Sequence, residues 1–280
     1  MSERSWRRPS RRLIITAITA LVAVAFAGGV AVAATQQPAI QTITPKTADD
    51  ITNLDVLRQQ IRNYYGDPLG TGVFAPDSNY ADEAAKVAAK GGQWLSTRSH
   101  FDGIPAIILD VDDTTLATYN YEIFSNWAFN PTTNGQFVTN QQFPAVPGMV
   151  DMANAAAAQG YAIIFLTGRG AAQEPATLGN LTSDGIGVDA GYPTPTTLND
   201  GEDGLFTKPA PANYPPYLQA ACAGDPNGVC TTIHYKSATR EHIESLGYDI
   251  VANFGDQFSD LNGGFADRTF KMPNPNYFLP

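Results

Sequence analysis

Three aspartates, Asp110, Asp112 and Asp113, follow directly after a short apolar run. The run, residues 106–109, reads Ala-Ile-Ile-Leu, a composition typical of a buried β-strand. In an extended chain Asp110 and Asp112 point to the same side, and two carboxylates so close together repel each other. A bound cation would relieve this repulsion, and oxygen ligands without histidine or cysteine favour Mg²⁺. The alternative is a solvated acidic turn or helix cap, which would suit Asp113 alone.

Two further apolar runs, residues 161–167 and 248–256, also end in polar residues. Helix-like segments separate the runs, and strands that alternate with helices predict a parallel sheet covered on both faces. The carboxyl ends of parallel strands share one edge of the sheet, where ligands bind in open α/β folds. We therefore expect the three ends to line one crevice. The second end carries the polar residues Thr167 and Arg169 on either side of Gly168, and the third end carries Asp256.

The remaining elements are predicted from helical spacing of apolar residues and from turn residues. Two helices are expected before the first strand and two more between the later strands. The predicted helices cover residues 51–65, 78–95, 147–160 and 240–247, and a Pro-rich loop over residues 191–217 contains a short strand at 205–208.

Four motifs occur in a fixed order between residues 106 and 261: LDVDDT, FLTG, HYKSATR and GDQFSDL. They resemble the four motifs of the haloacid dehalogenase (HAD) superfamily, whose phosphatases carry D-x-D-x-T as the first. TFKMPNPNYF and YKSATREHIESLGYDI are similar to the class B acid phosphatase-like branch, which holds plant acid phosphatases, vegetative storage proteins and bacterial lipoprotein e phosphatases. The resemblance covers about residues 50–280. It implies a Rossmann-like α/β fold with a small cap after the first motif, at about residues 118–145, and an N-terminal helical extension.

The resemblance also implies catalytic roles. Asp110 would be the nucleophile that takes the phosphoryl group, and Asp112 would protonate the leaving alcohol and then activate water. Thr167 would hydrogen-bond a phosphoryl oxygen, and Lys236 would neutralise the charge around the phosphate. Separately from the resemblance, the position of Arg169 directly after Thr167 and Gly168 suggests a contact with the phosphate, although a salt bridge or a surface cap would account for this residue equally well.

A metal site follows from the same resemblance. Mg²⁺ would be bound by Asp110, Asp256 and the backbone carbonyl of Asp112. Asp260 would help through water or by holding Lys236. The residues expected to contact substrate are Thr167, Gly168, Arg169 and Lys236.

The N-terminus predicts export. Residues 4–12 contain five arginines, residues 13–32 are free of charge, and Ala31-Val32-Ala33 matches a signal-peptidase site. SRRLII partly resembles a twin-arginine signal, and an uncleaved membrane anchor is the alternative. We expect a signal peptide over residues 1–33, a flexible leader over 34–50, a phosphatase domain over 51–280, and a secreted protein without a stable membrane partner.

Charge and cysteines fit an exported enzyme. The chain has a net charge of −10 and its first 33 residues carry +4, so the remainder carries −14. This excess of negative charge argues against nucleic acid as a partner, because a phosphate backbone needs a positively charged surface. Cys222 and Cys230, the only cysteines, predict a disulfide, with free thiols as the alternative.

Together these features predict a secreted, Mg²⁺-dependent acid phosphatase. It would hydrolyse small phosphomonoesters, with nucleoside monophosphates as candidate substrates, through an aspartyl phosphate. Asp112 favours a phosphatase within the superfamily, and Asp110 favours an active enzyme because vegetative storage proteins often lack the nucleophile. A phosphotransferase and a catalytically silent storage or phosphate-binding protein stay open as alternatives.

Overall fold

The computed structural model describes residues 44–182 and 185–279 of the chain. The predicted signal peptide and the predicted leader up to residue 43 lie outside these residues. Within them, no helix combines the length and the apolar character needed to cross a membrane.

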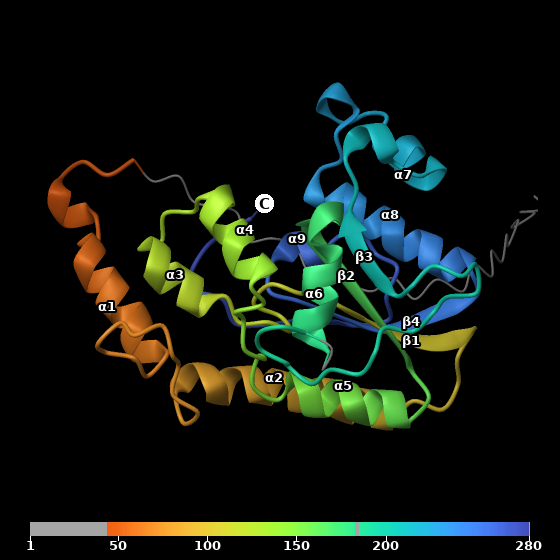
Figure 1. Ribbon diagram of the computed structural model, residues 1–280, viewed down its shortest axis with the longest axis horizontal. Helices are drawn as coiled ribbons and strands as arrows, with labels where there is room; N and C mark the ends of the chain where they lie inside the picture. Colours follow the sequence, from red (N-terminus) through yellow and green to blue (C-terminus); the bar gives the residue numbers. More distant parts are fainter. Residues whose placement is uncertain (1–43, 183–184, 280) are drawn as a thin grey trace, which may run out of the picture. The chain divides into compact units, whose positions relative to one another are not determined.

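A five-stranded parallel sheet forms the centre of the fold, with strand order β3-β2-β1-β4-β5 (Figure 1). The predicted α/β fold with a central parallel sheet is therefore confirmed. The last strand was not predicted, because three residues are too few to show a periodicity. The strands are β1 (Ile104–Leu109), β2 (Ala162–Gly170), β3 (Leu205–Lys208), β4 (Tyr248–Gly255) and β5 (Thr269–Lys271).

Helices cover both faces of the sheet. In Figure 1, α2 and α5 lie against one face and α8 lies against the other. The helices are α1 (Leu54–Tyr64), α2 (Asn79–Ser96), α3 (Tyr119–Ser125), α4 (Pro131–Thr139), α5 (Met149–Ala158), α6 (Glu174–Leu181), α7 (Pro216–Ala221), α8 (Thr232–Ser245) and α9 (Phe258–Leu261).

The central strand β1 divides its side chains between two hydrophobic cores. Ile107 and Leu109 pack with α2 and α5, whereas Ile108 packs with α8. Successive strand residues point to opposite faces, so a strand buried on both faces must be apolar throughout. This explains the unbroken apolar run before Asp110, and it makes β1 a rigid support for that residue.

Helix α8 begins earlier than predicted, at Thr232 instead of residue 240. Thr231 caps it, because its Oγ1 accepts a hydrogen bond from the backbone N–H of His234 at 3.2 Å. The eight additional residues include Lys236, which lies in the second turn of the helix. The position of this lysine is therefore fixed by a regular helix packed on the sheet.

The segment predicted as a cap contains α3 and α4. Its first helix is attached to the N-terminal part of the chain through Tyr119, whose ring stacks on Tyr65 with centroids 4.0 Å apart. The Tyr119 hydroxyl also donates to Asp67 Oδ2 at 3.0 Å. Farther along the segment, Tyr121 contacts the ring of Phe137 edge-on. These aromatic contacts hold α3 in place beside the sheet.

The predicted disulfide between Cys222 and Cys230 is confirmed. It closes the loop between α7 and α8, and both cysteines are buried in the core that includes α8. The Cys230 carbonyl accepts a hydrogen bond from Lys208 Nζ at 2.8 Å, so this loop also holds a side chain at the end of β3.

Candidate active site

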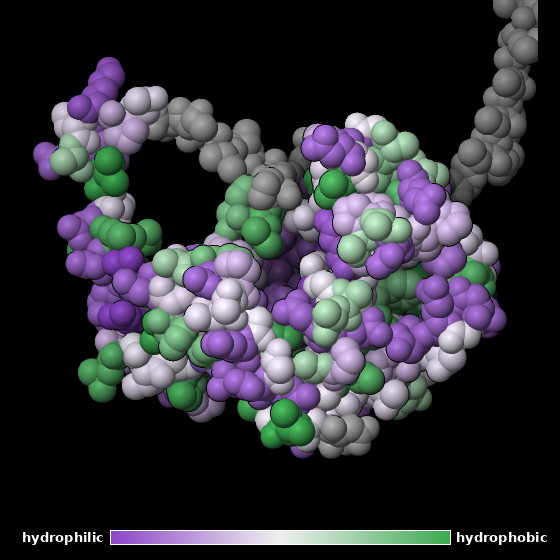
Figure 2. Space-filling view, turned by 45° about the horizontal axis from the view of Figure 1, so that its top comes forward, coloured by the Kyte–Doolittle hydropathy of each residue, from purple (hydrophilic) through white to green (hydrophobic). Residues whose placement is uncertain are grey.

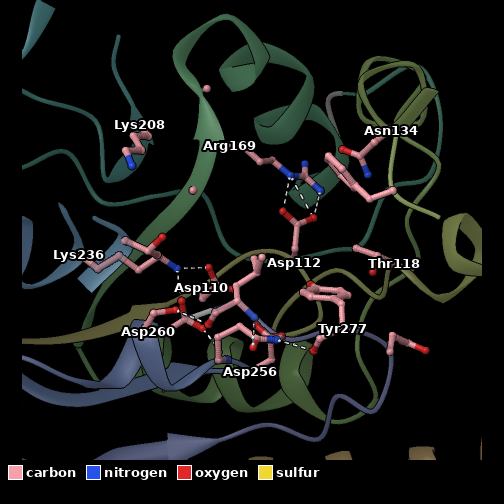
Figure 3. Close-up of a pocket in the computed structure, with 18 of the residues that line it drawn as sticks. Asp110, Asp112, Thr118, Asn134, Arg169, Lys208, Lys236, Asp256, Asp260 and Tyr277 are labelled. Carbon is pink, nitrogen blue, oxygen red and sulfur yellow. Dashed lines mark hydrogen bonds and ion pairs between the residues drawn. The ribbon is translucent and has the colours of Figure 1, made fainter. Parts of the chain in front are cut away.

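A cavity of about 410 Å³ lies at the carboxyl ends of β1, β2 and β4 (Figure 3). The space-filling view in Figure 2 shows a recess with hydrophilic residues inside it and hydrophobic residues along part of its rim. Thr167 is buried behind the wall, where its Oγ1 accepts the Arg169 backbone N–H at 3.1 Å. The other predicted site residues all line the cavity: Asp110, Asp112, Gly168, Arg169, Lys236, Asp256 and Asp260.

Lys236 forms ion pairs with two buried carboxylates. Its Nζ lies 2.6 Å from Asp260 Oδ1 and also pairs with Asp110. Burial raises the pKa of Asp110 well above its usual value, and the neighbouring Asp260 and Asp256 add to this effect against the opposing charge of Lys236. The pKa of Lys236 is also raised, because the two carboxylates outweigh the effect of burial. The Asp110 backbone N–H donates to the Phe254 carbonyl at 3.0 Å, which ties the end of β1 to β4.

Asp256 completes a cluster of acids that fits a metal ion. Its Oδ2 accepts hydrogen bonds from the side-chain amides of Gln257 and Asn274, each at 2.6 Å. Burial, followed by the charges of Asp260 and Asp113, raises its pKa to about 8.

Ligand oxygens of Asp110, Asp256 and Asp260 all lie within 4.8 Å of one another. Within the part of the chain that the structure describes, Lys236 supplies the one ammonium group paired with this cluster, so negative charge is left in excess. An oxygen-only donor set of this kind suits a hard divalent cation such as Mg²⁺, with Asp110 and Asp256 as the side chains that would hold it.

Asp112 is paired with a different cation. Arg169 donates to its carboxylate from Nε at 3.2 and 3.1 Å and from Nη2 at 2.6 Å (Figure 3). The guanidinium is itself held by Thr177 Oγ1, 3.1 Å from Nη1. We expected a metal ion to relieve the repulsion between Asp110 and Asp112. In the structure each carboxylate also has its own side-chain cation, and the expected contact of Arg169 with phosphate stays a prediction.

Asp113 is neither solvated nor part of the cavity wall, contrary to the suggestion that it would suit an exposed turn. It is fully buried with a left-handed φ of 52°, and it accepts hydrogen bonds from Thr118 N at 2.9 Å and Thr118 Oγ1 at 2.6 Å. Burial raises its pKa to about 7. No pattern in the sequence indicates that the partner of Asp113 lies five residues ahead, at the start of α3. Asp113 thus fixes the turn that carries α3 away from Asp110.

Arg240 positions the loop that carries Asp260. This buried guanidinium donates to the backbone carbonyls of Asp260 at 2.8 Å, Gly264 at 2.9 Å and Asn262 at 2.5 Å. Burial lowers the pKa of Arg240 to about 10. Arg240 does not line the cavity, so within the described residues it acts on the site only through this loop.

Glu122, which was not predicted as a site residue, lines the same cavity and is only 7% exposed. No residue in the described part of the chain hydrogen-bonds or ion-pairs with its carboxyl group. Burial, and secondly the charge of Asp112, raise its pKa to about 7. A signal was present, since Glu122 is the only charged residue between positions 118 and 145. Two aromatic residues of this segment, Trp127 and Phe129, also line the cavity.

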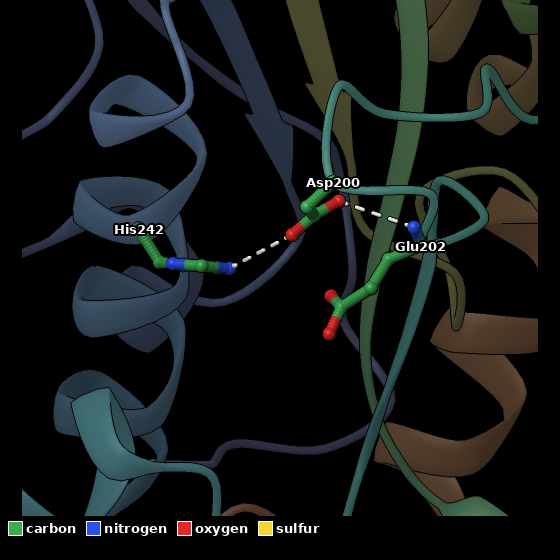
Figure 4. Close-up of side chains that lie close together, drawn as sticks. All are labelled: Asp200, Glu202 and His242. Carbon is green, nitrogen blue, oxygen red and sulfur yellow. Dashed lines mark hydrogen bonds and ion pairs between the residues drawn. The ribbon is translucent and has the colours of Figure 1, made fainter.

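A second group of possible metal ligands, Asp200, Glu202 and His242, does not line this cavity (Figure 4). His242 Nε2 lies 3.6 Å from Asp200 Oδ2, and the imidazole stacks on Tyr217 with ring centroids 4.2 Å apart. Both acids are exposed. These contacts describe a solvent-facing pair, and we do not include it in the candidate site.

Comparison with known proteins agrees with this arrangement. Residues 28–280 match the family described as HAD superfamily, subfamily IIIB (acid phosphatase), and the chain belongs to this family. A class C acid phosphatase from Bacillus anthracis has a similar fold, with a TM-score of 0.55 and 18% identity over 81% of this chain and 87% of the other.

Plant proteins are among its relatives in sequence. The chain is 32% identical to the stem 28 kDa glycoprotein of Glycine max over 61% of its own length and 59% of the relative. It is 26% identical to acid phosphatase 1 of Solanum lycopersicum over 71% and 69% of the two chains. It is also 26% identical to vegetative storage protein 2 of Arabidopsis thaliana over 82% and 76%. The matches to the Glycine max stem glycoproteins span only 50% to 59% of those proteins.

The buried Glu122 carboxyl predicts a pH-dependent difference between the wild type and Glu122→Gln. The raised pKa means that the unfolded state ionises first, near the ordinary value of 4.5, and the folded state near 7. The wild type therefore loses stability between these values as pH rises, because the charged form is poorly solvated when folded. Glu122→Gln lacks this loss. In thermal scans, the unfolding midpoint of the variant minus that of the wild type should therefore increase as the pH is raised from 4.5 to 8.

The matched control for this measurement is Glu241→Gln, at an exposed position of α8. Its midpoint should follow that of the wild type across the same pH range. A constant difference between Glu122→Gln and the wild type from pH 4.5 to 8 would show that the Glu122 carboxyl is not destabilised by burial.

Proposed function

We propose that the protein is an exported, Mg²⁺-dependent phosphomonoesterase that transfers the phosphoryl group of small esters to Asp110 and then to water. One observation carries this proposal: Asp110, Lys236, Asp256 and Asp260 meet in a buried cluster at the strand ends, in a chain that belongs to an acid phosphatase family. The disulfide supports export, because such bonds persist mainly in oxidising compartments.

In the first step an Asp110 carboxylate oxygen attacks phosphorus, and the bond between phosphorus and the ester oxygen breaks. Asp112 gives its proton to the departing oxygen, so that a neutral alcohol leaves. The Lys236 ammonium lies beside Asp110 and stabilises negative charge on the phosphoryl oxygens. Mg²⁺, when bound, supplies further positive charge at the same place.

In the second step Asp112 takes a proton from water, and the water oxygen attacks phosphorus. The bond between phosphorus and Asp110 breaks, which releases inorganic phosphate and restores the carboxylate. Asp112 needs a defined orientation for both proton transfers, and the three hydrogen bonds from Arg169 provide one. Arg169 is therefore a positioning residue in this mechanism.

A storage role without catalysis is the second candidate. Relatives named vegetative storage protein and stem glycoprotein favour it. The geometry favours the enzyme, because a storage protein has no need to bury three carboxyl groups around one lysine at a cost in solvation.

Hydrolysis of p-nitrophenyl phosphate tests the enzyme directly. EDTA should abolish the activity and added Mg²⁺ should restore it. Asp110→Asn keeps the shape of the side chain but removes the nucleophile, so kcat should fall by at least about 10³-fold. Asp151→Asn, at an exposed position of α5, is the matched control and should keep full activity. Activity that survives both EDTA and Asp110→Asn would rule out the proposed mechanism.

Arg169→Lys separates a positioning role from phosphate binding. Lysine keeps the charge but cannot make the paired hydrogen bonds to Asp112, so the proton transfers should slow. We expect kcat for p-nitrophenyl phosphate to fall about tenfold while KM changes less than about threefold. A large rise in KM with an unchanged kcat would instead make Arg169 a phosphate ligand.

A further inference from the structure

The cavity has two sides with different charge. Figure 3 places Lys208 and Lys236 on one side and Thr118 and Asn134 on the other. Thr118 and Glu122 are four residues apart at the start of α3, so they share one face of this helix. Glu122 therefore belongs to the side away from the two lysines, where a leaving group would lie when the phosphoryl group is at Asp110.

When Glu122 is ionised, this second side holds one negative charge more than its described residues balance. Among the described residues that line it, Arg169 is the one with a positive charge. Its guanidinium already donates hydrogen bonds to Asp112 and Thr177. Glu122 is 93% buried, because only 7% of its surface is exposed, and no described residue pairs with it. Buried charges are normally paired, since losing water without gaining a partner is unfavourable. The missing partner is therefore expected to come from a ligand.

The other side chains at this end suit a cation. Trp127 and Phe129 line the cavity, and aromatic faces attract positively charged groups. Trp127 already has one such contact, with the Arg62 guanidinium 5.7 Å from its ring centroid. Asn134 adds an amide oxygen, which accepts hydrogen bonds from an ammonium group.

We propose that Glu122 selects phosphomonoesters whose alcohol part carries an ammonium group. The proposal rests on the phosphatase function above and assigns the class of leaving group. The Glu122 carboxylate would receive the ammonium group while the phosphoryl group lies at Asp110 and Lys236. A neutral leaving group of the same shape would leave this carboxylate without a partner.

Matched pairs of esters test the proposal on the full chain with Mg²⁺ at pH 7.5. Each pair replaces the ammonium group by a methyl group of similar size: 2-aminoethyl phosphate with propyl phosphate, and 3-aminopropyl phosphate with butyl phosphate. The ammonium member of at least one pair should have a kcat/KM about tenfold higher or more. In Glu122→Gln this ratio should fall to about one, and in the exposed control Glu241→Gln it should not change.

The ratio within a pair cancels any general loss of activity in a variant. Equal kcat/KM values in both wild-type pairs would overturn the inference, and so would a ratio that Glu122→Gln preserves. If 2-hydroxyethyl phosphate and 2-aminoethyl phosphate have the same kcat/KM, the site recognises a hydrogen-bond donor rather than a positive charge, and the inference fails as stated. In each of these cases hydrolysis of the neutral esters still supports the phosphatase. Failure to hydrolyse any ester would contradict the phosphatase function itself.

Discussion

Burial of three carboxyl groups at the end of one sheet is the constraint on which the rest of this structure depends. Asp110, Asp256 and Asp260 are each almost inaccessible to water and close enough to share one ion. Electrostatic repulsion between such groups is strong where water cannot screen it. Burial, and after it the charges of the neighbouring carboxylates, raise the pKa values of Asp110 and Asp256, so this site also favours protons. A divalent ion and protons therefore compete for the same oxygens.

The two aspartates that follow β1, Asp110 and Asp112, pair with different cations, which come from different elements of the fold. Lys236 comes from α8 and pairs with Asp110, whereas Arg169 comes from β2 and pairs with Asp112. In the proposed mechanism this separation lets Asp110 attack phosphorus while Asp112 transfers protons. The surrounding structure supports each partner separately, through Thr177 beside Arg169 and through the Arg240-bound loop beside Lys236. The site is therefore assembled from contacts between elements that are far apart in sequence.

Most strands of the sheet could be predicted from the sequence, because a strand buried on both faces must be continuously apolar. The polar residues that follow each apolar run mark the end of the strand. The same reasoning brought Asp110 and Asp256 to one edge. A salt bridge was one of the alternatives for Arg169, and the structure shows one. Its partner, Asp112, was not predictable in this way, since the pair joins residues 57 positions apart through side chains alone. Asp113 was misjudged because its partner, Thr118, is polar and unremarkable in sequence. Glu122 could have been noticed as an isolated charge among aromatic residues, but its burial depends on how α3 is anchored.

The central claim is that this acidic cluster binds a divalent ion beside the nucleophile. Anomalous diffraction from crystals grown with Mn²⁺, which accepts the same oxygen ligands as Mg²⁺, tests it most directly. The account predicts a strong peak bonded to carboxylate oxygens of Asp110 and Asp256, with Lys236 still paired with Asp260. Crystals that bind Mn²⁺ only elsewhere, for example at Asp200, Glu202 and His242, would contradict it.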